Sequence, residues 1–504
     1  MFIRLFSTVI YRNSGALNFF MATKYVSEET TPLLKEPGTK KRLTELLWGD
    51  RVTIDAGTVA AGGFIKVKAR GKTGFVKEDH IGNESLLELY FIDVGQGDGV
   101  LIRTPDHKHI LIDGGYLRKY QPSGKNGADF VDWKFFKDYG TKTITIDAMV
   151  CSHNDADHYG GLWDIINPDE TENLDCTKVV VGAFYHAGVG WFKNASGARS
   201  LGKKENGFLH TLFDTNASIK KLLKTNPTGY QFQGEWRGFM ENVAEFIPEC
   251  KRLSNKTGYL HGFEENKKVS VKVLGPVEFK EGSKPVLKSL GNDSKNTNGN
   301  SALLMLQYGG CKILLTGDLN ANSQKLLLEA AVDNPKEFEC DIAKACHHGS
   351  HDVSYAFLEA MHAGATIISS GDEEGHDHPR PVIVAASALS GFKEVNGDVL
   401  VTPLVYSTEM ARSYRLGKTY ELKVRSGAEE KKLTPADKIQ AYYQETASGD
   451  LNPRKRDKEF WSTYLVSGIV YGLVNVRTDG KKILCATLNE KDATWSVKTF
   501  NARF

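Results

Sequence analysis

The stretch SHNDADHYGG, at residues 152–161, holds two histidines and two aspartates within six consecutive positions. All four side chains belong to types that bind metal ions: His153, Asp155, Asp157 and His158. One metal ion would leave several of these donors unused, whereas two ions a few ångströms apart would use them all. The alternative is a polar turn in which Asp157 caps a helix and solvent surrounds the histidines. The pattern favours a two-metal site over this turn.

Three later segments add ligand-type residues at the ends of predicted strands. LLTGDL ends in Asp318, KACHHGS contains His347 and His348, and SSGDEEGHDHPRP contains His376 and His378. The spacing is regular, with 30 residues from Asp318 to His348 and 30 more to His378. Successive strand and helix units deliver such residues to one rim of a sheet. These segments and the first stretch therefore predict one shared site.

The elements that must position these residues are short apolar runs that begin near residue 86. They include LLELYFIDVGQGDGVLIRT, HKHILIDGG, TITIDAMVCSH, TKVVVGAFYH, VSVKVLG and GATIISSGD, and each predicts a buried strand that stops at polar or small residues. SQKLLLEAAVDN and YAFLEAMHAG between them predict helices. GQGD is typical of a tight turn, and it lacks the Lys-Ser/Thr pair of a phosphate-binding loop. We expect a layered α/β fold with its site at the strand ends.

Five local matches resemble the metallo-β-lactamase superfamily and, within it, the ComEC/Rec2-like hydrolase domains of competence proteins. They are FIDVGQGDGVLI, LIDGG, SHNDADHYGG, NSALLMLQYGGCKILLTGDL, and HHGS followed by HP, between about residues 87 and 400. The resemblance implies an αββα sandwich of two mixed sheets with metals between them at one edge. Asp155 departs from the histidine usual in the superfamily, and the ComEC-like branch shares this change. A carboxylate there allows zinc and keeps manganese as an alternative.

The resemblance implies a cofactor of two divalent metal ions, with zinc favoured over manganese. The implied ligands are His153, Asp155 and one histidine of the 347/348 pair on the first ion, and Asp157, His158 and His378 on the second. Asp318 would bridge both ions, because a carboxylate has two oxygens and an imidazole could not bridge in the same geometry. His348 is the ligand we favour in its pair. The choices between His347 and His348, and between His376 and His378, stay open.

Two residues are candidates for roles in the reaction itself. Asp157 could orient an attacking hydroxide, and His347 could donate to a leaving group or steady a phosphate oxygen. His186, at the end of VVVGAFYH, and His376 are candidates for an additional metal contact. The resemblance also implies that Asp113 in LIDGG lies beneath the metal loop, where it would support the ligands.

The composition excludes some classes of protein. In 504 residues, Lys plus Arg number 64 and Asp plus Glu number 62, which argues against a protein that coats polyanions through bulk charge. The seven cysteines include no CxxC pair, which indicates a reducing compartment and excludes a cysteine zinc site or a disulfide framework. No run reaches the roughly 18 to 20 apolar residues of a membrane-spanning helix. We therefore predict a soluble, cytoplasmic protein.

The N-terminal region divides into two segments. Residues 1–25 are either a targeting leader or an over-extended start, because they carry arginines without nearby acids and a second methionine at position 21. Residues 26–84 alternate apolar and polar positions, as in FIKVKARGKTGFV, which predicts short antiparallel strands. WGD and GKTGFV in this segment resemble a bacterial SH3-like barrel. The alternative is a β-meander packed on the main domain.

The remaining chain is predicted to form a hydrolase domain at 85–400, with an insertion at about 185–265, and an extension at 401–504. Residues 191–260 hold eleven Lys plus Arg against six Asp plus Glu, so the insertion is either a shield for the core or a substrate-binding cap. In the extension, EEKKLTPADKIQAYYQETASGDLNPRKRDKEF predicts a helix and a polar linker. GIVYGLVNVRTDGKKILCATL predicts a β-hairpin that turns at Asp-Gly. Together they give a short α+β extension.

The predicted function is hydrolysis through a metal-activated hydroxide, most simply of a phosphodiester or nucleic-acid-like substrate. An alternative is a carboxylic ester, lactone or amide hydrolase that uses the same two metals. A second alternative is an inactive binding module whose SH3-like segment contacts peptide or cell-wall material. The lack of membrane spans in the sequence separates this chain from a DNA channel.

Overall fold

The computed structural model describes residues 22–121, 124–194, 196–224, 229–371, 378–408, 415–418, 421–426, 429–434, 437–445, 454–460, 464–467, 473–489 and 493–504. The chain divides into two compact units, Met1–Glu84 and Ser85–Phe504. Most of the predicted leader or over-extended start, residues 1–21, lies outside the described residues.

The smaller unit is an antiparallel sheet of seven strands in the order β3-β2-β6-β5-β4-β1-β7. The strands are β1 (Ala22–Val26), β2 (Thr30–Leu34), β3 (Arg42–Leu47), β4 (Arg51–Ile54), β5 (Phe64–Ala69), β6 (Lys72–Lys77) and β7 (Ile81–Gly82). The alternation in FIKVKA buries Ile65, Val67 and Ala69 and exposes the lysines between them. The predicted short antiparallel strands are therefore present, and the SH3-like barrel stays a prediction.

The larger unit contains a nine-stranded mixed sheet in the order β18-β12-β11-β10-β9-β8-β35-β36-β37. The strands are β8 (Leu87–Ile92), β9 (Val100–Arg103), β10 (His109–Ile112), β11 (Thr143–Cys151), β12 (Lys178–His186), β18 (Glu249–Arg252), β35 (Leu473–Thr478), β36 (Lys482–Asn489) and β37 (Thr494–Asn501). β10, β11, β12 and β18 run parallel to one another. Their carboxyl ends therefore meet at one edge of the sheet.

A six-stranded mixed sheet, in the order β19-β22-β23-β24-β25-β28, forms the second half of this unit. The strands are β19 (Ser270–Gly275), β22 (Leu303–Tyr308), β23 (Cys311–Leu315), β24 (Ile342–Lys344), β25 (Ala365–Ile368) and β28 (Leu404–Ser407). β23, β24, β25 and β28 are parallel, so Asp318 and the two histidines at 347 and 348 follow neighbouring strand ends.

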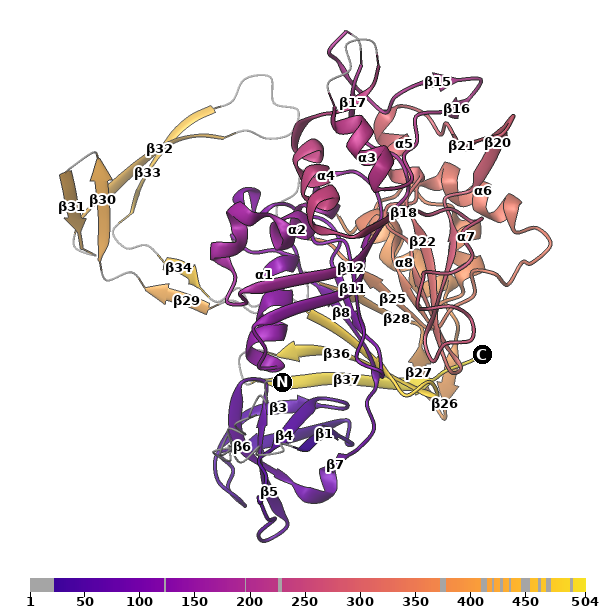
Figure 1. Ribbon diagram of the computed structural model, residues 1–504. Coiled ribbons are helices and arrows are strands. Elements are labelled where there is room, and N and C mark those ends of the chain that lie inside the picture. The colour runs from indigo at the N-terminus through magenta and orange to yellow at the C-terminus, as the bar shows by residue number, and fades with distance from the viewer. Residues whose placement is uncertain are drawn as a thin grey trace, which may run out of the picture. The chain divides into compact units, whose positions relative to one another are not determined.

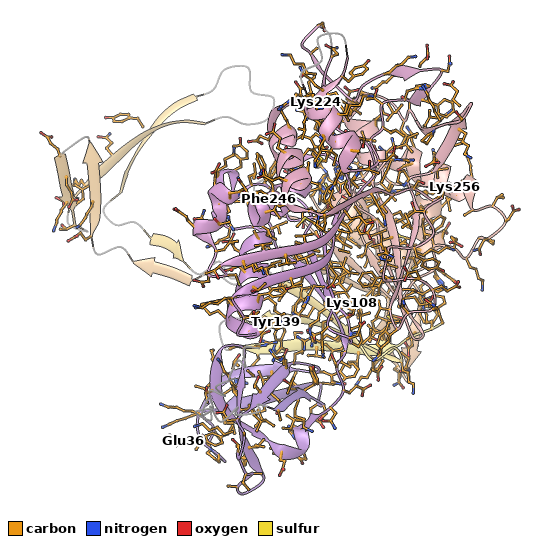
Figure 2. All side chains as sticks on the ribbon, viewed as in Figure 1. Glu36, Lys108, Tyr139, Lys224, Phe246 and Lys256 are labelled. Carbon is orange, nitrogen blue, oxygen red and sulfur yellow. The ribbon has the colours of Figure 1, made fainter. Side chains whose placement is uncertain are left out.

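The two sheets and their helices form layers. A buried apolar cluster with side chains from both sheets, including Leu89, Val150, Leu304 and Ile313, lies between them. The outer face of the nine-stranded sheet packs on helices, and so does that of the six-stranded sheet (Figure 1). The helices are α1 (Gly127–Trp133), α2 (Ala156–Ile166) and α4 (Gly234–Phe246) on the first face, and α6 (Ala321–Ala330) and α7 (Tyr355–Met361) on the second. This mixed α/β arrangement is consistent with the predicted metallo-β-lactamase-like sandwich, and side chains fill the space between the ribbons (Figure 2).

The predicted insertion adds small sheets and helices to the first helical layer. Its elements are β13 (Phe192–Lys193), β14 (Arg199–Ser200), β15 (Lys204–Glu205), β16 (Phe208–Leu209), α3 (Asn216–Leu223) and β17 (Gln231–Phe232), followed by α4 and β18. β15 and β16 share a sheet with β20 (Glu278–Glu281) and β21 (Lys284–Lys288). Trp191, Phe213, Phe232 and Trp236 of the insertion belong to the same buried cluster as α2. This part of the insertion is therefore part of the core.

The C-terminal region differs from the predicted α+β extension. Strand β32 (Ile439–Glu445) pairs with β33 (Arg454–Phe460) where a helix was expected, so the helix prediction is wrong. A strand forms there because every residue of this Ile- and Tyr-containing segment has an antiparallel partner in β33. The predicted hairpin is present and turns between β35 and β36, with Gly480 at a φ of +91°. Both of its strands complete the nine-stranded sheet.

The other helices and strands of this unit are short. They are α5 (Asp293–Gly299), α8 (Pro381–Ser390), β26 (Glu394–Asn396), β27 (Val399–Thr402), β29 (Arg415–Lys418), β30 (Leu422–Ser426), β31 (Glu429–Leu433) and β34 (Tyr464–Ser467). Among the described residues, every helix is too short or too polar to cross a bilayer.

Candidate metal centre

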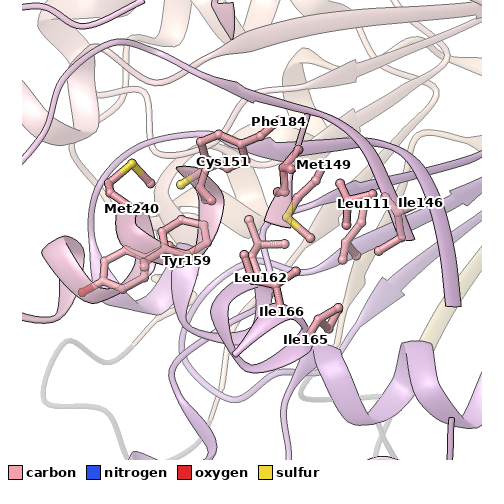
Figure 3. Packing of buried hydrophobic residues seen from close by; sticks show 14 of the residues in the cluster. Leu111, Ile146, Met149, Cys151, Tyr159, Leu162, Ile165, Ile166, Phe184 and Met240 are labelled. Atoms are coloured by element: carbon pink, nitrogen blue, oxygen red, sulfur yellow. The ribbon is translucent and has the colours of Figure 1, made fainter. Parts of the chain in front are cut away.

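The stretch HNDADH links β11 to α2. β11 ends at Cys151 and α2 begins at Ala156, so the connecting loop is very short. Tyr159, Leu162 and Ile165 of α2 pack against apolar side chains of the nine-stranded sheet, as Figure 3 shows. This packing holds the first turn of α2 against the sheet end, and the adjoining metal-type side chains with it.

Ligand-type atoms from both sheets converge beside this loop. The Oδ2 of Asp318 lies 3.4 Å from the Nε2 of His158 and 3.0 Å from the Nε2 of His348. The Oδ2 of Asp157 lies 3.8 Å and 3.7 Å from the same two nitrogens. Two groups have all their ligand atoms within 4.8 Å of one another and share a histidine: His153, His158 and Asp318, and Asp157, His158 and His348.

The hydrogen-bonding state of these atoms fits divalent metal ions. The Nε2 atoms of His153, His158 and His348 are buried and make no hydrogen bond among the described residues, and neither does the Oδ1 of Asp318. The short distance from His348 to Asp318 lacks the alignment of a hydrogen bond. Buried polar atoms without partners are rare in folded proteins, and three imidazole nitrogens of this kind lie around the carboxylate of Asp318. A donor set of imidazoles and carboxylates suits zinc or manganese.

The other ring nitrogen of each histidine is held by a neighbour. The Nδ1 of His158 lies 2.9 Å from the Oδ2 of Asp113, whose Oδ1 accepts from the backbone of Ser152 at 2.7 Å. The Nδ1 of His348 lies 3.1 Å from the carbonyl oxygen of Ser369. Such contacts fix the ring orientation and direct Nε2 towards a metal. Asp113 thus lies under the loop, in contact with a predicted ligand.

Two charged residues of the cluster were missed by the sequence analysis, Asp98 and Lys344. The ammonium of Lys344 forms an ion pair with Asp98, lies 3.6 Å from the Oδ1 of Asp318 and donates to the carbonyl of Gly317 at 2.8 Å. The Oδ1 of Asp98 lies 3.3 Å from the Nδ1 of His348. The signal for Lys344 was a lysine inside the apolar run DIAKAC, because lysine is almost never fully buried without a partner.

The GQGD turn that carries Asp98 packs directly on the metal loop. Gly97 has a φ of +115°, and a Cβ at this position would lie 2.0 Å from the carbonyl oxygen of Asp157. The glycine therefore permits both the backbone conformation and the contact. The sequence correctly predicted a glycine turn here. It could not reveal that this turn lies close to the metal loop.

Three residues without a glycine's freedom adopt left-handed backbone conformations at the site. Asp113, His347 and His348 have φ values of +56°, +48° and +53°. Such conformations are uncommon for residues with a Cβ and are held only by their surroundings. Because three such residues lie at one cluster, we infer that the fold retains unfavourable backbone conformations there in order to direct these side chains into the cluster.

Burial and opposite charges shift the pKa values of the cluster in a consistent way. Burial lowers the pKa of His348, but the carboxylates of Asp318 and Asp98 outweigh it and raise that pKa to about 10. Burial also lowers the pKa of His158, and Asp318 and Asp157 reverse this and raise it well above its usual value. Burial raises the pKa of Asp318, but the two histidines hold it well below its ordinary range. Protons thus balance the carboxylates in the protein alone, and bound cations would displace them.

Asp155 and His347 lie at the more accessible side of the cluster. The side chain of Asp155 is 28% exposed, and its Oδ2 lies 3.7 Å from the Nε2 of His153. The side chain of His347 is 25% exposed, with its Nε2 3.8 Å from the Oδ2 of Asp318. With the Asn298 amide turned over, its nitrogen donates to Asp155 and its oxygen accepts from His347. Asn298 in this orientation therefore forms hydrogen bonds with both Asp155 and His347.

The remaining candidate histidines differ in location. The ring of His378 lies 5.6 Å from that of His347 between centroids, and it is not part of the groups of clustered ligand atoms among the described residues. His376 lies outside the described residues.

His186 is not part of the groups of clustered ligand atoms among the described residues, although its Nε2 is also buried without a hydrogen bond there. Its ring stacks 4.1 Å from that of Phe213, and its Nδ1 accepts from the backbone of Gly188 at 2.9 Å. Burial, and after it the charge of Arg252, lowers its pKa to about 3. These contacts and the lowered pKa indicate a neutral imidazole that packs against aromatic side chains. Side chains at the end of a strand can lie on either face of the sheet.

Comparisons with known proteins give limited similarity. No protein-family model matches the chain. The chain is 22% identical to ComE operon protein 3 of Bacillus subtilis over 306 residues, which make up 59% of this chain and 30% of that protein. It therefore spans less than a third of that relative.

Two solved structures are also similar to the chain. One is a new diphosphatase from the PhnP family, with 15% identity, a TM-score of 0.27 and coverage of 59% of this chain and 89% of that one. The other is a variant of the CmlA beta-hydroxylase, with 10% identity, a TM-score of 0.30 and coverage of 65% of this chain and 54% of that one.

Replacing Lys344 by methionine is expected to destabilise the metal-free protein by about 3 to 5 kcal/mol, because Asp98 and Asp318 would lose their buried cation. Urea unfolding followed by circular dichroism measures the change. Lys325→Met, on an exposed position of α6, is the matched control and should change stability by less than about 0.5 kcal/mol. Equal losses in the two variants would show that the buried ion pair is unimportant.

Gly97→Ala should lower the melting temperature more than Gly207→Ala does. Both glycines have positive φ, but a Cβ at position 207 meets nothing within 4 Å, so the control isolates backbone strain from the clash with Asp157. Differential scanning fluorimetry of the two variants measures this difference. If the two melting temperatures fall equally, the GQGD turn does not pack on the metal loop as described.

Proposed function

We propose that this chain is a metal-dependent hydrolase with a metallo-β-lactamase-like fold that binds two divalent ions and cleaves a phosphodiester or nucleic-acid-like substrate. The observation that carries the proposal is the set of buried imidazole nitrogens without hydrogen bonds that surround Asp318. Ligand-type residues from the ends of both sheets contribute to this set. An imidazole and carboxylate cluster of this kind is the usual donor set of hydrolytic metal sites.

The proposed ligands are the residues of the two groups that share His158, together with Asp155, whose Oδ2 lies 3.7 Å from the Nε2 of His153. His153 and Asp155 would hold the first ion, Asp157 and His158 the second, and Asp318 both. We assign His348 to the second ion, because its Nε2 groups with Asp157 and His158 rather than with His153. This changes the expectation from the sequence, in which a histidine of the 347/348 pair binds the first ion. His378 remains a proposed additional ligand of the second ion.

The chain's own side chains would orient the reacting groups. Two bound divalent ions would supply charge that lowers the pKa of a water molecule towards neutrality and neutralises the substrate's oxygens. The Oδ2 of Asp157 accepts from the amide of Gln96 at 3.2 Å, which holds this carboxylate in a fixed direction and suits it to orient the attacking water. Burial lowers the pKa of His347, which favours a neutral imidazole able to donate a hydrogen bond to a phosphate oxygen or a leaving group.

A phosphodiester is the substrate class that we favour over a carboxylic ester. Residues 191–260 hold eleven Lys plus Arg against six Asp plus Glu, and a local positive surplus suits an anionic substrate. The resemblance to ComEC-like hydrolase domains points to the same class. The proposed mechanism requires no serine or cysteine nucleophile.

The purified chain should hydrolyse bis(p-nitrophenyl) phosphate after loading with zinc or manganese and should bind about two ions per chain. Asp318→Asn is expected to lower the rate by about 100-fold and to reduce the bound metal, because the charged oxygens between both ions are lost. His261→Gln is the control, since this side chain is 74% exposed outside the cluster. Absorbance assays and metal analysis by mass spectrometry measure both effects.

Parallel assays with a generic lactone separate the alternatives. Activity on the lactone alone would replace the phosphodiester proposal by a carboxylic ester hydrolase. Fewer than one bound ion per chain after loading, with neither substrate cleaved, would favour an inactive binding module.

A further inference from the structure

The smaller unit distributes its charges unevenly along the chain. Its residues 22–84 hold eleven Lys plus Arg and nine Asp plus Glu. Strands β1, β4, β5 and β6 are consecutive neighbours in the sheet, and together they contain six Lys plus Arg and no acidic residue. The acidic residues therefore lie on the other segments, and these four strands form a positively charged sheet within a nearly neutral unit.

Part of this charge lies on the outer face of the hairpin that β5 and β6 form. Ile65, Val67 and Val76 belong to the buried cluster of the unit, so the side chains that alternate with them point away from that cluster. The lysines at these alternating positions are exposed, and the two phenylalanines among them are half-buried. The antiparallel register pairs these residues as Phe64 with Lys77, Phe75 with Lys66 and Thr73 with Lys68, and we call the six residues the lysine face.

The hairpin that carries the lysine face is held in a fixed conformation. Arg70 and Gly71 form its two-residue turn with φ values of +48° and +71°, as the tightest hairpins require. The guanidinium of Arg70 lies 2.8 Å from the carboxylate of Asp50, and the ammonium of Lys72 donates to the carbonyl of Leu43 at 3.0 Å. These contacts tie the turn to the rest of the unit. A surface that is already ordered loses little conformational entropy when it binds a partner.

The lysine face places ammonium groups beside aromatic rings. Lysines bind the phosphates of nucleic acids and aromatic rings stack on bases, and proteins combine these two contacts to bind single strands. A duplex stacks its bases within its own helix, so they are not free to lie on Phe64 or Phe75. A membrane surface is a poorer fit, because insertion among lipid headgroups needs exposed apolar side chains, and these two rings are half-buried.

From the charge and the aromatic rings of this surface, we propose that the lysine face binds single-stranded nucleic acid. Lys66, Lys68 and Lys77 contact the phosphates, and the exposed parts of Phe64 and Phe75 stack on bases. The lysine face belongs wholly to the smaller unit. The inference therefore goes beyond the proposed hydrolysis at the metal cluster and does not depend on it.

Fluorescence anisotropy of labelled oligo(dT) and oligo(U) strands of about 20 nucleotides, titrated with the full chain, tests the charge of this surface. EDTA in the buffer removes divalent ions, so binding is measured without hydrolysis. Replacing both Lys66 and Lys68 by glutamine should weaken binding at low salt by about ten-fold. The slope of log Kd against log salt concentration should fall by about 1.4, because each phosphate contact on a single strand contributes about 0.7.

The matched control replaces Lys325 and Lys336 by glutamine. Both are exposed lysines of the larger unit, so this variant loses the same total charge outside the lysine face. It should bind the strands as the unaltered chain does. Equal weakening in the two double variants would show that only the net charge of the chain matters and would overturn the proposal.

Phe75→Leu tests the stacking contact separately from the charge. This variant should bind the strands about five-fold more weakly with an unchanged salt slope, because a base loses its aromatic partner while every lysine remains. Circular dichroism checks that the variant is folded, and the exposed lysine variants test the surface in any case. Unchanged binding by folded Phe75→Leu would overturn the assignment to single strands.

Two further ligands test the class of partner. A duplex of the same length should bind more weakly than the single strands, and vesicles of phosphatidylserine and phosphatidylcholine should not bind through Lys66 and Lys68. Equal or tighter binding of the duplex, binding of the vesicles alone, or no binding of either strand would overturn the proposal. If the strands bind through the lysine face but no ester is cleaved by the metal-loaded chain, this surface stands and the hydrolase proposal fails.

Discussion

The structure depends on the burial of several carboxylates beside imidazoles and one lysine at the meeting point of two sheets. Taking ionised groups out of water costs several kcal/mol for each ion unless partners compensate for the lost hydration. Lys344 bridges Asp98 and Asp318, and neighbouring carboxylates raise the pKa values of His158 and His348, which favours their protonated forms in the protein alone. Divalent cations would supply that charge more effectively, because they bind carboxylates and neutral imidazoles together. The chain itself therefore supplies only part of the positive charge that these buried carboxylates require.

The need to bring these charged side chains together explains why both sheets contribute to the cluster. The nine-stranded sheet contributes the metal loop and Asp113, and the six-stranded sheet contributes Asp318, Lys344 and His348. The ligand set therefore exists only when the two sheets pack together. The apolar cluster between the sheets holds them in that relation, and β35, β36 and β37 near the C-terminus belong to the nine-stranded sheet. Three left-handed residues and the close contact of Gly97 lie at the same edge, where the backbone must turn sharply to direct side chains inward.

The sequence was sufficient to predict the candidate ligands that follow directly after apolar strands. His153, Asp157, His158, Asp318 and His348 each follow an apolar run, and the structure brings them together. His186 follows such a run too; its ring stacks on that of Phe213, and it is not part of those groups of clustered ligand atoms among the described residues. Asp98 was missed because a glycine turn carries no sign of its distant partners. Lys344 was missed because a lysine within an apolar run indicates that a buried partner exists and does not identify it. The helix expected at Ile439–Glu445 failed because cross-strand pairing, which depends on residues further along the chain, outweighed the local pattern.

Anomalous X-ray diffraction from crystals of the zinc- or manganese-loaded chain, recorded on both sides of the metal's absorption edge, would locate any bound ions in the cluster. We expect two peaks about 3.5 to 4 Å apart, on either side of Asp318 and next to His158. Peaks found only elsewhere, for example at the surface group of Glu205, His210 and Glu281, would contradict this expectation.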